Sequence, residues 1–434
     1  MRRGRLFFLV TLFGTFVAPG AWAQTISITS IPPYAVDGFL DGVVTGVDTA
    51  THEVAVYIQI EGSGWWTKPT TGMPSVPIAP DGSWSANVAT GGPASLDSRA
   101  TIYCAALIQA SHTPPPASGE GRIPAGLQSL DLVCGERYGR TIQFAGATWA
   151  VKESPIPVGP GSNLFSDRVE DVFVDPQGRL HLAVDQHDGS WWGVEVILLE
   201  RFGYGTYLMQ TESELDDLDV NLTFGAFTWD PYGDEESVPG DAHREIDFED
   251  GRWGDAGDPT NAQFVVQPWN APDNLHRYTL PDLSAASELT RFFTWTADRI
   301  DFVALRGHHG ASGYPPGDVI DSFDYTHAPA SGRYVPTPGR AGFRINLWPN
   351  NVGLGGPGPP QPAGGQRVEV VVTHFVPEPG SPQGLGAGLL LLTWLAARRR
   401  RRRCSGRARG RRLAAGPPGG RDSSRETEEA REEE

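Results

Sequence analysis

Three acidic residues stand at alternate positions near the middle of the chain, in the stretch HREIDFEDGRWG. Glu245, Asp247 and Glu249 are separated by single apolar residues, Ile246 and Phe248. Because side chains alternate between the two faces of a strand, this spacing predicts three carboxylates on one open face and an apolar pair in the core. With a rise of about 3.3 Å per residue, the α-carbons of the two glutamates would lie roughly 13 Å apart.

Carboxylates in this arrangement could cleave a glycosidic bond. Glutamate side chains that lean inward over a concave sheet can approach the separation of roughly 5 to 5.5 Å used by retaining glycosidases. Three like charges repel at such distances, so we expect one carboxyl group to have a raised pKa and to serve as an acid. Two other interpretations stay open on residue chemistry alone. One is a solvated polar face, and the other is a structural calcium site with Asp255 and Asp258 as further ligands.

The segments around the acids predict an all-β chain. Residues 143–375 contain many short runs of β-branched and aromatic residues broken by Gly, Pro and Asp, and no long amphipathic helix is indicated. This pattern predicts a two-sheet β-jelly-roll over residues 139–375. Residues 24–138 predict a smaller N-terminal β-sandwich. Its tryptophans could stack on sugars or fill its core: Trp65, Trp66 and Trp84.

The sequence EIDFE at residues 245–249 closely resembles the E-I-D-x-E signature of glycoside hydrolase family 16, in the form without the extra bulge residue of laminarinase-type members. The resemblance covers most of residues 143–375, because further stretches follow the family's order: 225–229, 261–264, 291–306 and 343–348. It implies a concanavalin A-like jelly roll that needs no cofactor for catalysis and holds no metal at the catalytic residues.

The resemblance also implies a role for each acid. Glu245 would be the nucleophile, Glu249 the general acid/base, and Asp247 the residue that hydrogen-bonds and tunes the nucleophile. Five residues would bind sugar: Trp229, His243, Gln263, Asn346 and Trp348. Certain lichenase-like members carry a tryptophan where this chain has His243, which leaves the choice of substrate open. For the two tryptophans, a purely structural place in the core also stays open.

The first residues predict export. Three arginines precede an apolar run at residues 6–17, and Ala21-Trp22-Ala23 matches a small-x-small cleavage site, so we expect residues 1–23 to be a signal peptide. An exported chain reaches an oxidising space, where Cys104 and Cys134 are candidates for a disulfide.

The last residues predict a sorting segment at 376–403. Val376-Pro377-Glu378-Pro379 precedes an apolar run at 384–397 and then six arginines. This order resembles the PEP-CTERM signal of Gram-negative bacteria and implies an exosortase-type processing enzyme as partner. The apolar run is short for a permanent span of roughly 20 residues, so contact with the membrane would occur only through this segment. Residues 404–434 predict a disordered charged tail.

Charge narrows the class of ligand. Without the predicted leader, the sorting segment and the tail, about 19 basic and 44 acidic residues remain, a net charge near −25. Such a surface repels nucleic acid and anionic membranes and suits a neutral ligand. The sequence therefore predicts a secreted or cell-surface endo-acting β-glycanase that hydrolyses a β-1,3-glucan, a β-1,3-1,4-glucan or a galactan with retention of configuration. The alternative is a non-catalytic carbohydrate-binding or extracellular matrix protein that uses the same concave face.

Overall fold

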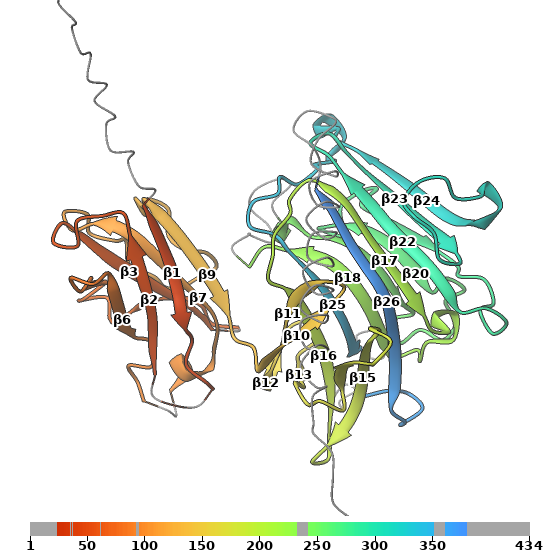
Figure 1. Cartoon of the computed structure of the whole chain (residues 1–434), viewed down its shortest axis with the longest axis horizontal. Helices are drawn as coiled ribbons and strands as arrows, with labels where there is room; N and C mark the ends of the chain where they lie inside the picture. Colours follow the sequence, from red (N-terminus) through yellow and green to blue (C-terminus); the bar gives the residue numbers. More distant parts are fainter. Residues whose placement is uncertain are drawn as a thin grey trace, which may run out of the picture. The chain divides into compact units, whose positions relative to one another are not determined.

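The computed structural model describes residues 24–34, 36, 38–60, 62–92, 95–231, 242–350 and 361–379 (Figure 1). The predicted signal peptide, the apolar run with its arginines, and the charged tail lie outside these residues. Regular structure in the described ranges consists of strands and short 3-10 turns, so the chain is all-β as predicted. No helix in this part of the chain is long and apolar enough to cross a bilayer.

The N-terminal residues form two packed sheets. The strands are β1 (Thr25–Ser30), β2 (Phe39–Thr45), β3 (His52–Ile60), β4 (Gly64–Lys68), β5 (Ser75–Pro77), β6 (Ser83–Asn87), β7 (Ala100–Gln109), β8 (Ser118–Glu120) and β9 (Asp131–Glu136), with turn η1 (Leu96–Arg99). One sheet has the order β1-β2-β6, and the other has the order β8-β4-β3-β7-β9 with β5 beside β3. Apolar side chains from both sheets share one core.

The aromatic and cysteine side chains of this sandwich are mostly internal. Trp65 and Trp84 are buried, and Trp66 is partly buried and packs against the core. Cys104 of β7 lies directly opposite Cys134 of β9, and a disulfide joins the two.

The following strands build a second, larger sandwich. They are β10 (Arg140–Phe144), β11 (Ala147–Val151), β12 (Ser154–Val158), β13 (Asn163–Phe165), β14 (Val172–Val174), β15 (Leu180–His187), β16 (Ser190–Leu198), β17 (Gly205–Glu212), β18 (Leu222–Trp229), β19 (Ile246–Gly251), β20 (Ala262–Val266), β21 (Leu275–Tyr278), β22 (Glu288–Trp295), β23 (Arg299–Arg306), β24 (Val319–Thr326), β25 (Gly342–Pro349) and β26 (Val368–Pro379). Turns connect several of them: η2 (Leu215–Asp217), η3 (Ala242–Arg244), η4 (Pro316–Asp318) and η5 (Pro329–Ser331).

Strand pairing divides this sandwich into two layers. The first has the order β10-β11-β16-β25-β18-β19-β20-β21. The second has the order β14-β15-β26-β17-β22-β23-β24 (Figure 1). Pairing of the end of β15 with the start of β16 connects the two layers. This is the two-layer arrangement of a jelly roll.

Aromatic side chains fill the space between the layers. Phe248 of β19 lies 5.9 Å from Phe293 of β22, and Phe264 of β20 lies 5.1 Å from Phe302 of β23, measured between ring centroids. One face of β19 therefore packs in the core. The side chains at alternate positions must face the other way, which places the acids on the outer face of the first layer.

The last strand continues past residue 375, where the sequence predicts the end of the jelly roll. β26 runs to Pro379, and its final residues pair with the start of β17, with Pro379 opposite Gly205 (Figure 1). The Pro-Glu-Pro element therefore belongs to the sheet.

Candidate active site

The structure brings the three predicted acids into one cavity. Glu245 immediately precedes β19, and Asp247 and Glu249 lie within it. All three line the same cavity on the outer face of the first layer, while Ile246 and Phe248 are buried in the core. The alternation predicted from the sequence is therefore present, although Asp247 lies at the floor of the cavity with an exposed fraction of only 2% rather than on an open surface.

A strained turn precedes the first acid. His243 and Arg244 have φ angles of 52° and 54°, in the left-handed region where residues other than glycine are strained. Thr228 Oγ1 donates to the Arg244 carbonyl at 2.8 Å, and Arg244 Nε donates to Asp230 Oδ2 at 3.0 Å. These contacts tie the turn to β18 and fix the point at which Glu245 enters the cavity.

Asp247 is hydrogen-bonded to its neighbour. Burial raises the pKa of Asp247 well above its usual value, and the nearby charges of Glu245 and Glu249 raise it further, as does a side-chain hydrogen bond with Glu245. Gln267 Nε2 donates to Asp247 Oδ2 at 3.2 Å, which opposes this shift. A carboxyl group that keeps its proton can donate it in a hydrogen bond, so Asp247 is arranged to donate to Glu245.

The pKa of Glu249 is raised toward neutrality. Burial raises the pKa of Glu249 to about 7, against the lowering effect of a hydrogen bond from Gln263 Nε2 at 2.6 Å. Arg277 Nη1 donates to Gln263 Oε1 at 3.0 Å and so fixes the orientation of the amide. A carboxyl group with a pKa near neutrality can donate a proton in one step and accept it in another. The predicted role of Gln263 as a cleft residue therefore takes the specific form of contact with the acid.

Asn346 and Trp348 of β25 line the cavity beside the acids. Gly225 of β18 pairs with Asn346, and a β-carbon at this glycine would lie 2.8 Å from Asn346 Oδ1, so a larger residue would displace the amide. Within the described residues Asn346 Oδ1 is buried without a hydrogen-bond partner. An unpaired buried acceptor at a cavity wall suits a hydroxyl group of a ligand.

Trp229 and His243 also line the cavity, but they contact each other. Their rings stack at 3.9 Å between centroids with an angle of 9° between the planes. His243 Nδ1 donates to the Asp230 carbonyl at 3.0 Å, which fixes the imidazole. His243 therefore covers one face of the Trp229 indole, and the Arg344 guanidinium carbon lies 5.7 Å from the centroid of the same ring.

The cavity also contains an ion network that the sequence did not predict. Arg344 Nη1 donates to Glu195 Oε1 at 2.9 Å, and Arg344 Nη2 contacts Glu136 at 2.5 Å. Lys152 Nζ lies 3.3 Å from Glu195 Oε2. Burial alone would raise the pKa of Glu195, but Lys152 and Arg344 hold it below its usual value. In the sequence, the one local indication of this network is Glu195, a single acid within the apolar run VEVILL.

The two aspartates considered as calcium ligands each accept a hydrogen bond from a residue nearby. Asp255 Oδ1 accepts from the backbone nitrogen of Gly257 at 2.8 Å, and Asp258 Oδ2 accepts from Arg277 Nη2 at 2.6 Å.

No protein-family model matches the chain, and no curated protein matches its sequence. Solved structures match about half of it. A β-1,3-1,4-glucanase (lichenase) from a mouse hindgut metagenome is 18% identical and covers 54% of this chain and 93% of its own, with a TM-score of 0.37. An immunostimulatory antigen and pseudo β-1,3-glucanase of Mycobacterium tuberculosis is 18% identical and covers 54% of this chain and 91% of its own, with a TM-score of 0.37. A glycosyl hydrolase family protein from Mycobacterium fortuitum is 16% identical and covers 56% of this chain and 99% of its own, with a TM-score of 0.37.

Proposed function

We propose that this protein is a retaining endo-β-glycanase that hydrolyses O-glycosidic bonds of a neutral polysaccharide. The observation that carries the proposal is the set of three acids in one cavity, in which Asp247 hydrogen-bonds Glu245 and the pKa of Glu249 is raised to about 7. One acid is thus prepared to act as a nucleophile and another to give up a proton at neutral pH.

In the first half of the reaction, a carboxylate oxygen of Glu245 attacks the anomeric carbon of the sugar. The bond from that carbon to the glycosidic oxygen breaks, and Glu249 transfers its proton to the departing oxygen. The product is an ester between Glu245 and the sugar. Asp247 orients the nucleophile and tunes its charge through their hydrogen bond.

In the second half, the roles of the acids reverse. Glu249, now ionised, accepts a proton from a water molecule, whose oxygen attacks the anomeric carbon and releases Glu245. Two displacements at the same carbon restore the original configuration. Gln263 holds Glu249 through its amide in both steps.

The charges around the cavity support a neutral glycan such as a β-1,3-glucan, a β-1,3-1,4-glucan or a galactan. The cations Arg344 and Lys152 face the carboxylates of Glu195 and Glu136. Arg137, which also lines the cavity, donates to two backbone carbonyls and to the Tyr103 hydroxyl, so each of these three cations already has partners within the chain. Hydroxyl groups would instead meet Asn346, and a sugar ring would meet Trp348.

We further propose that the chain acts outside the cell, at the surface or in the matrix of a Gram-negative bacterium. The predicted signal peptide and the Pro-Glu-Pro, apolar and arginine order support export and processing by an exosortase-type enzyme. Mass spectrometry of the exported protein should find a mature chain without residues 398–434.

The proposal is tested with purified protein on a panel of plant, algal and bacterial polysaccharides, with reducing ends measured over time. We expect release from at least one β-glucan or galactan, and the first product observed by NMR should have the β-configuration. Glu245→Gln should release none. Binding to a glycan without any release by the wild type would instead favour the carbohydrate-binding alternative.

A further inference from the structure

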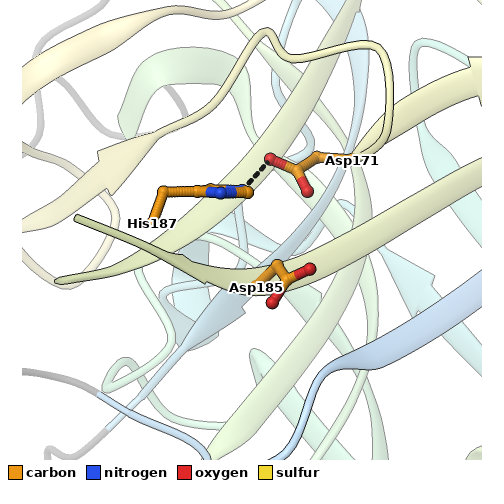
Figure 2. Close-up of side chains that lie close together, drawn as sticks. All are labelled: Asp171, Asp185 and His187. Atoms are coloured by element: carbon orange, nitrogen blue, oxygen red, sulfur yellow. Dashed lines mark hydrogen bonds and ion pairs between the residues drawn. The ribbon is translucent and has the colours of Figure 1, made fainter. Parts of the chain in front are cut away.

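A second group of acidic and imidazole side chains lies outside the cavity of the three acids. Asp171, just before β14, faces Asp185 and His187 near the end of β15 (Figure 2). One ligand atom from each residue lies within 4.8 Å of the others. The mechanism proposed above uses none of these residues.

Asp171 is held in place through one of its two carboxylate oxygens. Ser166 Oγ donates to Asp171 Oδ2 at 2.5 Å, and His187 Nε2 donates to the same oxygen at 2.7 Å. The side chain is fully buried. These two bonds fix the plane of the carboxylate and therefore the direction in which its second oxygen points.

The second oxygen of Asp171 has no hydrogen-bond partner in the described part of the chain. Figure 2 shows it on the side of Asp171 that faces Asp185. A buried carboxylate oxygen without a partner costs free energy, and a second carboxylate nearby adds repulsion. The contact of Asp185 Oδ2 with Arg367 Nη1 is long, at 3.6 Å, and offsets this repulsion only in part.

We propose that Asp171, Asp185 and His187 bind a divalent transition-metal cation of the zinc or manganese class. Such a cation would give Asp171 Oδ1 its missing partner and would offset the charges of two carboxylates. An imidazole nitrogen beside carboxylates suits zinc and manganese, whereas calcium takes oxygen ligands only. On binding, the single ring proton of neutral His187 moves from Nε2 to Nδ1 by exchange with water, and Nε2 coordinates the metal. The hydrogen bond from Nε2 to Asp171 is thereby replaced by metal bonds from both residues.

The site would brace the hairpin of β15 and β16. Asp188 and Gly189 form its tip with φ angles of 52° and 81°, and Trp192 Nε1 donates to the His187 carbonyl at 3.3 Å. Gly193 follows on β16, and a β-carbon added there would lie 3.2 Å from the β-carbon of Trp348, a lining residue of the cavity. A bound cation would therefore restrict the motion of the β15–β16 hairpin next to Trp348.

The test uses the full chain after removal of metal by chelation, with ZnCl₂, MnCl₂ and CaCl₂ titrated separately by calorimetry. We expect one equivalent of zinc or manganese to bind at least about tenfold more tightly than calcium. Asp185→Asn and His187→Gln should each weaken that binding by about tenfold or more. Both residues are only partly buried, and melting in metal-free buffer verifies that the variants fold.

Asp188→Asn is the matched control, because Asp188 is an exposed neighbour whose side chain pairs with Arg168. It should bind zinc like the wild type. Glu249→Gln should also do so, which separates this site from the acids of the cavity. The proposal is overturned by the absence of saturable zinc and manganese binding, by equal or tighter calcium binding, or by binding that survives both Asp185→Asn and His187→Gln. It does not depend on whether the chain cleaves glycans.

Discussion

Asp247 and Asp250 are three positions apart on β19, and both are almost completely buried, yet their surroundings differ. Asp250 points into the core and contacts Arg291, a buried cation that opposes the rise in pKa caused by burial. Asp247 points into the cavity, where its neighbours are two further acids, and its pKa is raised well above the usual value. Burial alone therefore does not decide the protonation of a carboxyl group. The partner decides whether a buried carboxyl group pairs with a cation in the core or keeps its proton beside other acids.

Glu245→Gln gives the largest expected effect on the cavity side of this comparison. The amide cannot form the ester with the sugar, so turnover of polysaccharide and of aryl glycosides should fall by about 10³-fold or more. Rates measured on one polysaccharide and one activated aryl glycoside test this. Glu200→Gln, at an exposed position outside the cavity, is the control and should keep the wild-type rates.

For the buried pair of Asp250 and Arg291, the substitution Arg291→Met should have the largest effect on stability. It leaves the charge of Asp250 buried without its partner, which should lower the free energy of unfolding by about 3–5 kcal/mol. Thermal and urea denaturation measure the loss. The double variant Asp250→Leu/Arg291→Met should recover much of it, because it removes both charges together. A single variant as stable as the wild type would show that the pair does not compensate Asp250.

Glu249→Gln should separate two classes of substrate. Without a proton donor, polysaccharide cleavage should decrease by about 10²-fold or more. An aryl glycoside whose leaving group departs without a proton should still form the ester with Glu245, so a burst of phenol release should remain. Equal losses on both substrates would argue against Glu249 as the acid.

Glu249 should also affect how stability depends on pH. Its pKa is higher in the folded chain than in the unfolded chain, so the folded state binds the proton more tightly. Stability from this group is complete below its usual pKa of 4.5 and is lost as the pH rises toward about 7. Between pH 5 and pH 8, the free energy of unfolding of the wild type should therefore decrease by up to about 3 kcal/mol more than that of Glu249→Gln. The melting temperature of the wild type should also decrease by more than that of the variant. A larger decrease in the variant would contradict this.

Asp247→Asn should have the smallest effect of the cavity variants, about tenfold on turnover, because Asp247 acts through Glu245 and forms no bond to the sugar. The pH profile gives a readout that a structural role would not change. The acid limb, which depends on ionised Glu245, should shift, while the alkaline limb, which depends on protonated Glu249, should remain near pH 7.

Local alternation explains why part of the site could be predicted from the sequence. The positions of Glu245, Asp247 and Glu249 opposite Ile246 and Phe248 depend on residues next to one another, and a strand admits one pattern of faces. The two-layer all-β architecture followed from the same kind of local signal, repeated along the chain. The burial of Asp247 could not be predicted from this signal, because it also depends on residues outside β19, such as its hydrogen-bond partner Gln267.

Contacts between distant residues could not be predicted in this way. Arg344 meets Glu195 and Glu136 only after β25 has paired with β16 and the first sandwich has folded. Asp171 meets His187 through the pairing of β14 with β15. In each case the sequence shows isolated charged residues, and the fold supplies the partner.

The most direct test of the central claim is to trap the ester on the nucleophile. A 2-deoxy-2-fluoro β-glycoside with an activated leaving group, matched to the polysaccharide that the protein cleaves, slows both steps but the second more strongly. We predict that the intact mass of the chain increases by one fluoroglycosyl group and that proteolysis places this group on Glu245. Glu245→Gln should gain no mass. A stable adduct on another residue, or inversion of the anomeric configuration by an active wild type, would contradict the account.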